Sequence, residues 1–258
     1  MGGNDEVLPP AFRVMNEHGT SSYVLICEHA SRFIPACYNG LGLPASELQR
    51  HIAWDIGAEA VAMTLSASID APLVLANYSR LLIDLNRPPQ SNTAMPEISE
   101  STVIPGNVRL SGAERRWRID TLFTPFQDRV SQLLDARLAA GRPTALVAVH
   151  SFTPVFKGVA RPWQAGVLYR RSRSFGEALI AALGGAAAGI AANQPYQIDD
   201  GSDYTVPVHG EARGLDAVLV ELRQDLIADA AGAALWARRL AEALSVCTAR
   251  PSATLPAG

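Results

Sequence analysis

Three polar residues of the chain suit metal-assisted hydrolysis, and each follows or ends an apolar segment: His29, His150 and Glu221. Neutral imidazoles are common zinc ligands, and a catalytic zinc site has three protein ligands and a fourth position for water, whose pKa the metal lowers. A free carboxylate beside that water can move protons. The pattern predicts a metal site with a general base. The alternative is that each histidine is a hydrogen-bonded residue at the end of a strand.

Apolar runs rich in β-forming residues must position these side chains. Residues 22–27 precede His29, residues 144–149 precede His150, and residues 217–222 contain Glu221. Further strands are expected at 72–76, 79–87 and 166–169, and helices at about 44–68, 113–140, 174–183 and 225–246. Such alternation predicts an α/β fold with a mostly parallel or mixed central sheet and helices on both faces. Ligands of these sheets bind beyond the carboxyl ends of the strands.

The chain is expected to form a single domain over residues 1–258, with flexible ends at 1–20 and 249–258. Residues 88–112 hold four prolines, two glycines and little periodicity, so this loop is a candidate lid. Pro125 is expected to divide the helical stretch at 113–140 into two pieces, because proline lacks a backbone donor.

Composition excludes several classes of protein. The 22 Lys and Arg residues against 25 Asp and Glu give a net charge of −3, so the chain lacks the basic field that binds nucleic acid or an anionic membrane. Three cysteines without a CxxC pair give neither a disulfide framework nor a thiolate zinc site. The N-terminus lacks the pattern of a signal peptide, and a cytoplasmic protein is expected. The oligomeric state stays open.

Five ordered segments carry a resemblance to a known family. They are 27–31 (Cys-Glu-His-Ala-Ser), 51–57 (His-Ile-Ala-Trp-Asp-Ile-Gly), 79–87 (Ser-Arg-Leu-Leu-Ile-Asp-Leu-Asn-Arg), 150–154 (His-Ser-Phe-Thr-Pro) and 220–226 (Val-Glu-Leu-Arg-Gln-Asp-Leu). Their order and spacing resemble the N-formylglutamate amidohydrolase family from about residue 22 to residue 244. The resemblance implies hydrolysis of an N-acyl amino acid and a sheet architecture related to zinc carboxypeptidases and aspartoacylase.

Similarity to the zinc carboxypeptidases implies roles for four residues. His150 is similar to a zinc-binding histidine in a strand-end His-Ser-Tyr segment. Asn86 and Arg87 look like the pair that binds the carboxylate of the substrate, and a guanidinium can do so through two parallel hydrogen bonds. Glu221 matches the general base of a Glu-Leu-Arg segment. If Glu221 were not the base, it would be a strand-end carboxylate paired with a cation such as Arg223.

The third metal ligand departs from the carboxypeptidase pattern. Those enzymes have a glutamate three residues after the first zinc histidine, whereas this chain has Arg32, which cannot ligate zinc. Asp55 is the first choice, because it is expected on the helix that follows the first strand. Glu28 is the alternative, although in a strand its side chain would point away from the face that His29 uses. An additional water molecule or a weaker site stays open.

Other residues are secondary candidates. Arg80 could stabilise the developing oxyanion, or form a salt bridge to a nearby carboxylate. His209 could shape the substrate pocket or carry a proton, or be a surface histidine, and Arg223 is expected on the substrate-binding face of its strand. His51 and His18 are interpreted as solvent or helix-face histidines.

The function that follows from the resemblance is zinc-dependent hydrolysis of an N-acyl amino acid similar to N-formyl-L-glutamate. The products would be a carboxylic acid and a free amino acid. The alternatives are a carboxypeptidase-like peptidase, a deacylase of another N-acyl amino acid, and a non-catalytic protein of this fold that binds a carboxylated ligand. A binding protein would not need a general base, so Glu221 favours an enzyme.

Overall fold

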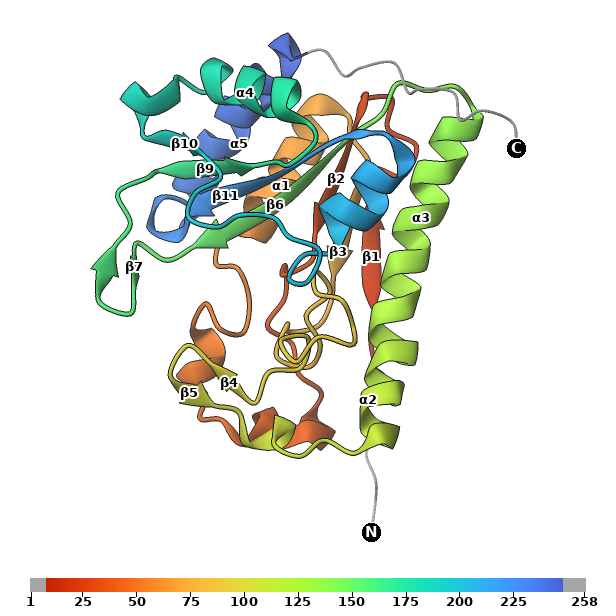
Figure 1. The fold of residues 1–258 in the computed structure, drawn as a ribbon, viewed down its shortest axis with the longest axis vertical. Helices are drawn as coiled ribbons and strands as arrows, with labels where there is room; N and C mark the ends of the chain where they lie inside the picture. The colour runs from red at the N-terminus through yellow and green to blue at the C-terminus, as the bar shows by residue number, and fades with distance from the viewer. Residues whose placement is uncertain (1–7, 248–258) are drawn as a thin grey trace.

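The structure is a computed structural model that describes residues 8–247. Its centre is a seven-stranded sheet (Figure 1). The strand order is β1-β3-β2-β6-β11-β9-β10. The bounds are β1 Phe12–Met15, β2 Tyr23–Cys27, β3 Leu73–Ala76, β6 Ala145–Phe152, β9 Ala165–Leu168, β10 Ile190–Ala192 and β11 Asp216–Arg223. β3, β2, β6 and β11 are mutually parallel, whereas β1 and β9 run antiparallel to β3 and β11. The predicted mixed, mostly parallel sheet is confirmed.

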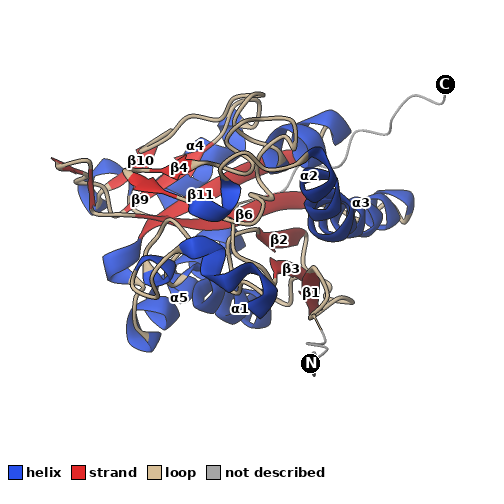
Figure 2. Cartoon of the chain, turned by 90° about the horizontal axis from the view of Figure 1, so that it is seen from below, coloured by secondary structure: helices blue, strands red, loops and turns tan. Residues whose placement is uncertain are grey.

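Helices cover both faces of this sheet, as predicted (Figure 2). They are α1 Ala58–Ile69, α2 Gly112–Arg118, α3 Thr124–Ala139, α4 Arg173–Ala182 and α5 Ala230–Val246. α1, α4 and α5 bury one face, and α3 buries the other with the long loops. Alternate residues of the central strands divide between the two cores, since side chains of a strand alternate in direction: Leu25 lies in the first core and Ile26 in the second.

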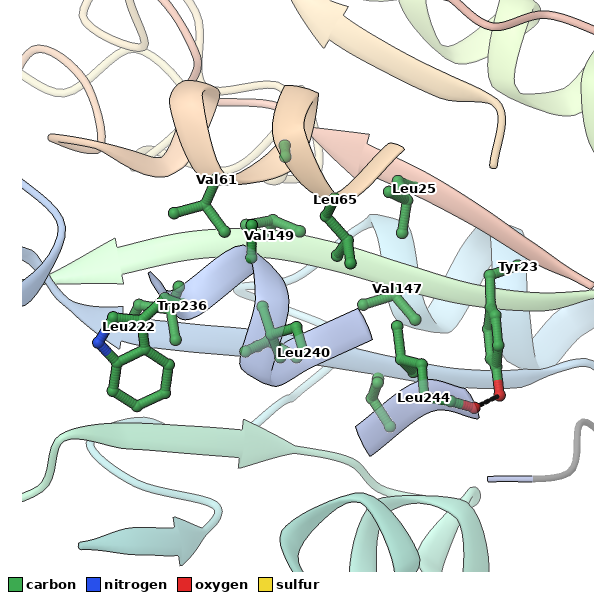
Figure 3. Close-up of a cluster of buried hydrophobic side chains, with 14 of the residues drawn as sticks. Tyr23, Leu25, Val61, Leu65, Val147, Val149, Leu222, Trp236, Leu240 and Leu244 are labelled. Atoms are coloured by element: carbon green, nitrogen blue, oxygen red, sulfur yellow. Dashed lines mark hydrogen bonds between the residues drawn. The ribbon is translucent and has the colours of Figure 1, made fainter. Parts of the chain in front are cut away.

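Figure 3 shows the core between α1, α5 and the sheet. Val61 and Leu65 of α1 and Leu240 of α5 pack against strand residues such as Val149. Tyr23 is buried there with its hydroxyl donating to the backbone oxygen of Leu244 at 2.9 Å. Burial of these apolar side chains on both faces makes the sheet a rigid base for the loops at its edge.

The helical regions at 113–140 and 44–68 differ in how well they match the prediction. Pro125 lies in the first turn of α3, and α2 joins α3 through one π-helical turn, Ile119–Phe123, so the two expected pieces are confirmed. The helix expected from residue 44 begins only at Ala58. Gly57 before it has a φ of 81°, and a Cβ there would lie 2.2 Å from the backbone oxygen of Ile227, so the chain needs a glycine where the helix begins.

The prediction of a strand at residues 79–87 was wrong, because this segment forms successive turns. The amide of Leu82 donates to Ser79, that of Asp84 donates to Ala94, and that of Arg87 donates to Asp84. Its apolar residues are buried, and a buried apolar run does not by itself distinguish a strand from a packed loop. The turns bring the polar residues of this segment to the end of the sheet.

The ends and the long loop also differ in part from expectation. Residues 8–20 include β1, which pairs with β3, so this part of the chain is not a flexible end; residues 1–7 and 248–258 lie outside the described residues. The loop at 88–112 contains a short hairpin, β4 Ile98–Ser99 and β5 Thr102–Val103, and a second hairpin consists of β7 Val155–Phe156 and β8 Val159–Ala160. No helix among residues 8–247 has the length and apolarity to cross a membrane.

Candidate functional site

A cleft of about 520 Å³ opens at the carboxyl ends of β2, β6 and β11. This is the edge at which ligands bind in sheets of this kind. The segment 79–87 and the β4–β5 hairpin contribute to its walls, as do the residues between β10 and β11. The cleft therefore collects side chains from at least four separate parts of the chain.

Three of its side chains, His29, Asp55 and His150, turn ligand atoms toward one point. His29 follows β2, His150 lies near the end of β6, and Asp55 lies in the loop before α1. The Oδ2 atom of Asp55 is 3.3 Å from Nδ1 of His29 and 3.0 Å from Nδ1 of His150. Among the described residues these three are the group whose ligand atoms all lie within 4.8 Å of one another.

The outer nitrogen of each histidine faces another buried carboxylate. Nε2 of His29 is 2.7 Å from Oδ1 of Asp84, and Nε2 of His150 is 3.0 Å from Oε2 of Glu28. In a neutral imidazole, a carboxylate on the outer nitrogen favours the tautomer with the proton on Nε2, and the Nδ1 lone pair is then directed at the shared point. Histidines that ligate metals have this arrangement in proteins.

The electrostatic balance of the cluster favours a cation. Burial lowers the pKa of His150, but Glu28 and Asp55 outweigh burial and hold this pKa well above its ordinary value. Burial raises the pKa of Asp55, but the two histidines outweigh burial and hold that pKa below its ordinary value. The carboxylate therefore stays charged, and the surrounding negative charges stabilise positive charge between the three side chains.

The structure distinguishes Asp55 from Glu28. Asp55 reaches the inner nitrogen of both histidines, whereas Glu28 reaches the outer nitrogen of His150 and accepts a hydrogen bond from Thr205. Asp55 is placed by its own backbone amide, which donates to the oxygen of His29 at 2.9 Å, and by the amide of Ser151, which donates to its Oδ2 at 3.1 Å. The expectation that Asp55 lies on a helix was wrong, because the helix begins after Gly57.

Glu221 stands beside this cluster. It is the register partner of His150 across the parallel pair of β11 and β6, so both side chains project from the same face of the sheet. Its Oε2 atom is buried and has no hydrogen-bond partner among the described residues. Burial raises the pKa of Glu221 to about 7. A carboxyl group in a cleft is suited to moving protons when one of its oxygens is buried without a hydrogen-bond partner and its pKa is raised toward neutral pH.

Arg80 lies between two of the carboxylates. Its Nη1 donates to Oδ1 of Asp55 at 3.1 Å, and its Nε and Nη2 donate to Oδ2 of Asp84 at 3.1 and 2.6 Å. This is the salt-bridge alternative for Arg80, and its guanidinium holds Asp55 and Asp84 in fixed orientations. Arg80 also lines the cleft, and it could stabilise a developing oxyanion only through the part of its side chain that faces the cleft.

Asn86 and Arg87 both line the cleft but have different surroundings. The Oδ1 atom of Asn86 accepts hydrogen bonds from the amides of Tyr204 and Thr205 at 3.1 and 2.9 Å, so Asn86 orders that segment. Arg87 donates through Nη1 to the backbone oxygen of Ser202, and its Nε is 3.9 Å from Oδ2 of Asp84. Its side chain is 30% exposed, so part of it is accessible to a ligand in the cleft.

Two predicted substrate-binding residues lie elsewhere. Arg223 is paired with Asp225, at 2.8 Å between Nε and Oδ1, and does not line the cleft. It follows Glu221 on the same face of β11, but the strand ends there and the nearby acid draws its side chain away. His209 is buried against Gln127, to whose Oε1 its Nε2 donates at 2.7 Å, and burial lowers its pKa to about 4.

Sequence reasoning missed several cleft residues. Asp84 was part of a quoted segment, but without the turns at 79–87 nothing indicated that it would reach His29. His51 lines the cleft, contrary to its interpretation as a solvent or helix-face histidine. Tyr196 and Asp203 also line it, from the irregular segment before β11. That segment has no periodicity that could have indicated a site.

The residues present fit a divalent cation. Two imidazole nitrogens and one carboxylate oxygen form a three-ligand set of the kind that binds catalytic zinc, with carboxylates behind both histidines. The unpartnered buried oxygen of Glu221 beside them is suited to hold a water molecule. Together these groups could activate water against a polarised carbonyl.

The chain is similar to known proteins in sequence and in fold. Residues 21–228 match the family model described as N-formylglutamate amidohydrolase. The chain is similar to gene product Atu2144 from Agrobacterium tumefaciens, with 42% identity, a TM-score of 0.88 and coverage of 92% of this chain and 96% of that chain. It shares its fold with N-formylglutamate amidohydrolase from Ralstonia eutropha JMP134, at 16% identity and a TM-score of 0.67 over 93% and 97% of the two chains. Among curated proteins, none gives a significant match.

Proposed function

Because the chain belongs to the N-formylglutamate amidohydrolase family, we propose that it is a metal-dependent hydrolase of N-acyl amino acids, with N-formyl-L-glutamate as the reference substrate. The products are a carboxylic acid and a free amino acid. The observation that carries this proposal is the convergence of His29, Asp55 and His150 in a cleft that also holds the unpartnered carboxyl group of Glu221. A binding protein of this fold would not need that carboxyl group.

The three residues would hold zinc through Nδ1 of His29, Nδ1 of His150 and Oδ2 of Asp55. When bound, the cation would polarise the acyl carbonyl and lower the pKa of water. Asp84 and Glu28 orient the two imidazoles, and Arg80 orients Asp55 and Asp84. These outer contacts would hold the ligand atoms in position before substrate arrives.

Glu221 is the proposed general base and then the general acid. Its carboxylate accepts a proton from the attacking water, and the oxygen of that water forms a bond to the acyl carbon. The same proton then passes to the amide nitrogen as the carbon–nitrogen bond breaks, which releases a neutral amine from the intermediate. Burial raises the pKa of Glu221 above that of an ordinary glutamate, which makes its carboxylate a stronger proton acceptor for the first transfer.

Arg87 is the proposed anchor for the α-carboxylate of the substrate. Its guanidinium lines the cleft and is partly exposed, and a guanidinium can bind a carboxylate through two parallel hydrogen bonds. Asn86 acts indirectly in this proposal, since its amide holds residues 203–205 next to Arg87. The expected substrates therefore carry a free α-carboxylate.

The proposal is tested with protein purified without added metal. Metal content is measured first, and hydrolysis of a panel of N-acyl amino acids is then followed with and without a chelator. We expect about one equivalent of a divalent cation and release of free amino acid that the chelator abolishes and zinc restores. Hydrolysis that continues in fully metal-free protein, or no hydrolysis of any panel member by the metal-loaded protein, would refute the proposed function.

A further inference from the structure

A second pocket adjoins the cleft at the carboxyl ends of β6 and β11. Its volume is about 430 Å³, and His51, Glu100 and Thr153 line both the cleft and this pocket. Gln224, the first residue after β11, lines the second pocket and not the cleft. The two spaces therefore share one wall, and a ligand of sufficient length could occupy both.

The second pocket begins close to the reactive groups. Thr153 directly follows β6, three residues after His150, and Gln224 directly follows β11, three residues after Glu221. Because His150 and Glu221 are register partners, the chain leaves the sheet at Thr153 and at Gln224 on neighbouring strands. A rise of about 3.3 Å per residue puts these two residues roughly 10 Å beyond the proposed ligand and the proposed base.

Thr153 and Gln224 each carry a buried polar atom without a partner. Among residues 8–247, the buried side-chain atoms that have no hydrogen-bond partner are Oε2 of Glu221, Oγ1 of Thr153 and Oε1 of Gln224. The first lies in the cleft, the second in the shared wall and the third in the second pocket. Thr153 is 6% exposed, so its hydroxyl has little access to bulk water. An unpaired buried polar atom destabilises a folded protein, so these positions favour a ligand that extends from the cleft into the second pocket.

The charged residues that line the second pocket compensate each other. Arg50 donates through Nη1 to Oε2 of Glu47 and through Nη2 to Oε2 of Glu100, both at 2.5 Å. Nε2 of His51 lies 3.6 Å from the same oxygen of Glu100. An ionic ligand would have to compete with these pairs. The pocket is therefore better suited to a neutral polar group than to a carboxylate or an ammonium group.

Hydrogen-bonding capacity narrows the ligand further. Oε1 of Gln224 can accept hydrogen bonds, whereas the hydroxyl of Thr153 can both donate and accept. A neutral ligand for both atoms needs a donor and an acceptor, and an amide group has them in its N–H and its carbonyl. A hydrocarbon chain has neither. The side chains of Ile56 and Val155, which also line the pocket, offer apolar contact to the methylene groups between successive amides.

We propose that the second pocket binds amide groups in the acyl part of the substrate. The enzyme then favours N-acyl amino acids whose acyl group is itself a short peptide over those with a hydrocarbon acyl group of the same length. This inference rests on the proposed function, in which Arg87 holds the amino-acid part within the cleft and leaves the acyl part to reach the second pocket. A formyl group is too short to reach it.

The test compares two extended substrates with N-formyl-L-glutamate, using metal-loaded protein. N-(acetylglycylglycyl)-L-glutamate has two amides within its acyl group, and N-octanoyl-L-glutamate has an acyl chain of the same length without them. Release of free L-glutamate reports cleavage of the equivalent bond in all three compounds. We expect kcat/KM to be about tenfold higher for the peptide compound than for the octanoyl compound, as for one or two hydrogen bonds gained.

Two variants remove the unpartnered atoms. Gln224→Leu and Thr153→Val keep the approximate size of the side chain, and each should lower the ratio of kcat/KM for the peptide compound to that for the octanoyl compound about two- to tenfold, as for one lost hydrogen bond. Gln132→Leu and Thr64→Val make the same changes at exposed positions of α3 and α1 and should keep the wild-type ratio. Thermal unfolding shows that each variant is folded.

Calorimetry gives a readout that does not depend on turnover. The ligands are N-acetylglycylglycine and octanoate, the acids that cleavage of the two extended substrates releases. Gln224→Leu should weaken binding of N-acetylglycylglycine more than binding of octanoate. An equal change for both acids would contradict an amide-binding pocket.

The outcomes separate this inference from the proposed function. If both variants kept the wild-type ratio, or if wild-type protein cleaved the octanoyl compound as well as the peptide compound, water and not substrate would satisfy Thr153 and Gln224. The inference would then be overturned and the hydrolase assignment would stand. Cleavage of N-formyl-L-glutamate and of neither extended compound would have the same consequence. Absence of hydrolysis of every N-acyl amino acid by metal-loaded wild-type protein would overturn the proposed function, and the inference with it.

Discussion

Glu221 and His150 are partners in the register of β11 and β6, and their side chains project side by side from one face of the sheet. Parallel pairing of β6 with β11 fixes this relationship, and β2 and β9 hold the two strands from either side, β2 parallel to β6 and β9 antiparallel to β11. The proposed base is therefore held beside a proposed metal ligand by two central strands of the sheet.

The first prediction concerns this base. Glu221→Gln keeps the size of the side chain and removes its capacity to accept a proton, so kcat should fall about a hundred- to ten-thousandfold. Metal content and substrate affinity should change little. Steady-state kinetics and metal analysis of the same preparation check both statements, and a metal-loaded Glu221→Gln enzyme that retains near wild-type kcat would exclude Glu221 as the base.

The second prediction concerns the three ligands. His29→Ala and His150→Ala should each lose most of the bound metal, because loss of one ligand of three disrupts a catalytic site. Asp55→Ala should weaken metal binding more than Glu28→Ala, since Asp55 reaches the inner nitrogens and Glu28 an outer one. Metal affinities from competition with a chelator give the order. The reverse order would make Glu28 the ligand.

The third prediction concerns the residues behind the histidines. Asp84→Asn removes the charge behind His29 and breaks the ion pair with Arg80, so metal affinity should fall about ten- to a hundredfold. Glu28→Gln should have a similar effect through His150. Asp225→Asn removes a charge at the end of β11, outside the cleft, and serves as a control. If Asp84→Asn and Glu28→Gln both bound the metal as tightly as the wild type, the carboxylates behind the two histidines would not contribute to metal affinity.

The fourth prediction concerns the α-carboxylate. Arg87→Lys keeps the charge and loses the two-pronged geometry, so KM should rise far more than kcat changes. Wild-type enzyme should respond in the same way to a substrate whose α-carboxylate is amidated. Unchanged kinetics with the amidated substrate would mean that Arg87 does not hold this group.

The fifth prediction concerns pH and stability. Burial, with Arg213 second, lowers the pKa of His209 to about 4, against about 6.5 in an unfolded chain. Between these values the unfolded state binds more protons, so the free energy of unfolding falls as pH falls from 6.5 toward 4. His209→Gln keeps a donor for Gln127 and should lose less stability between pH 7 and pH 5, by on the order of 1 to 2 kcal/mol.

Urea unfolding at several pH values measures this difference. The control is His18→Gln, at an exposed position, which should follow the wild type. If His209→Gln had the same pH dependence as the wild type, the buried histidine would not account for the loss of stability in acid.

Local pattern in the sequence was enough for the parts of the site that belong to strands. The apolar runs before His29 and His150 and around Glu221 predicted buried parallel strands, and parallel strands present their carboxyl ends at one edge. The two-residue period of a strand also places Glu221 and His150 on definite faces. The resemblance of the five segments indicated the family, which the match over residues 21–228 then showed.

The remaining features depended on tertiary structure, because they come from loops whose side chains are placed by contacts far apart in the chain. The helix begins only after Gly57, which lies against Ile227, and Asp55 in the loop before it lies between two histidines. The turns at 79–87 bring Asp84 to His29 and Arg80 to both carboxylates.

Arg223 illustrates the same limit from the opposite side. The two-residue period of β11 predicted that Arg223 would lie on the same face as Glu221. In the structure Arg223 instead forms an ion pair with Asp225, two residues farther along the chain. Arg161, in contrast, had no pattern around it, and only the folded chain surrounds it with Phe152, Phe156 and Tyr196. The two-residue period of a strand predicts the face of the sheet on which a side chain lies. The charged groups and aromatic rings around it in the folded chain determine its final orientation.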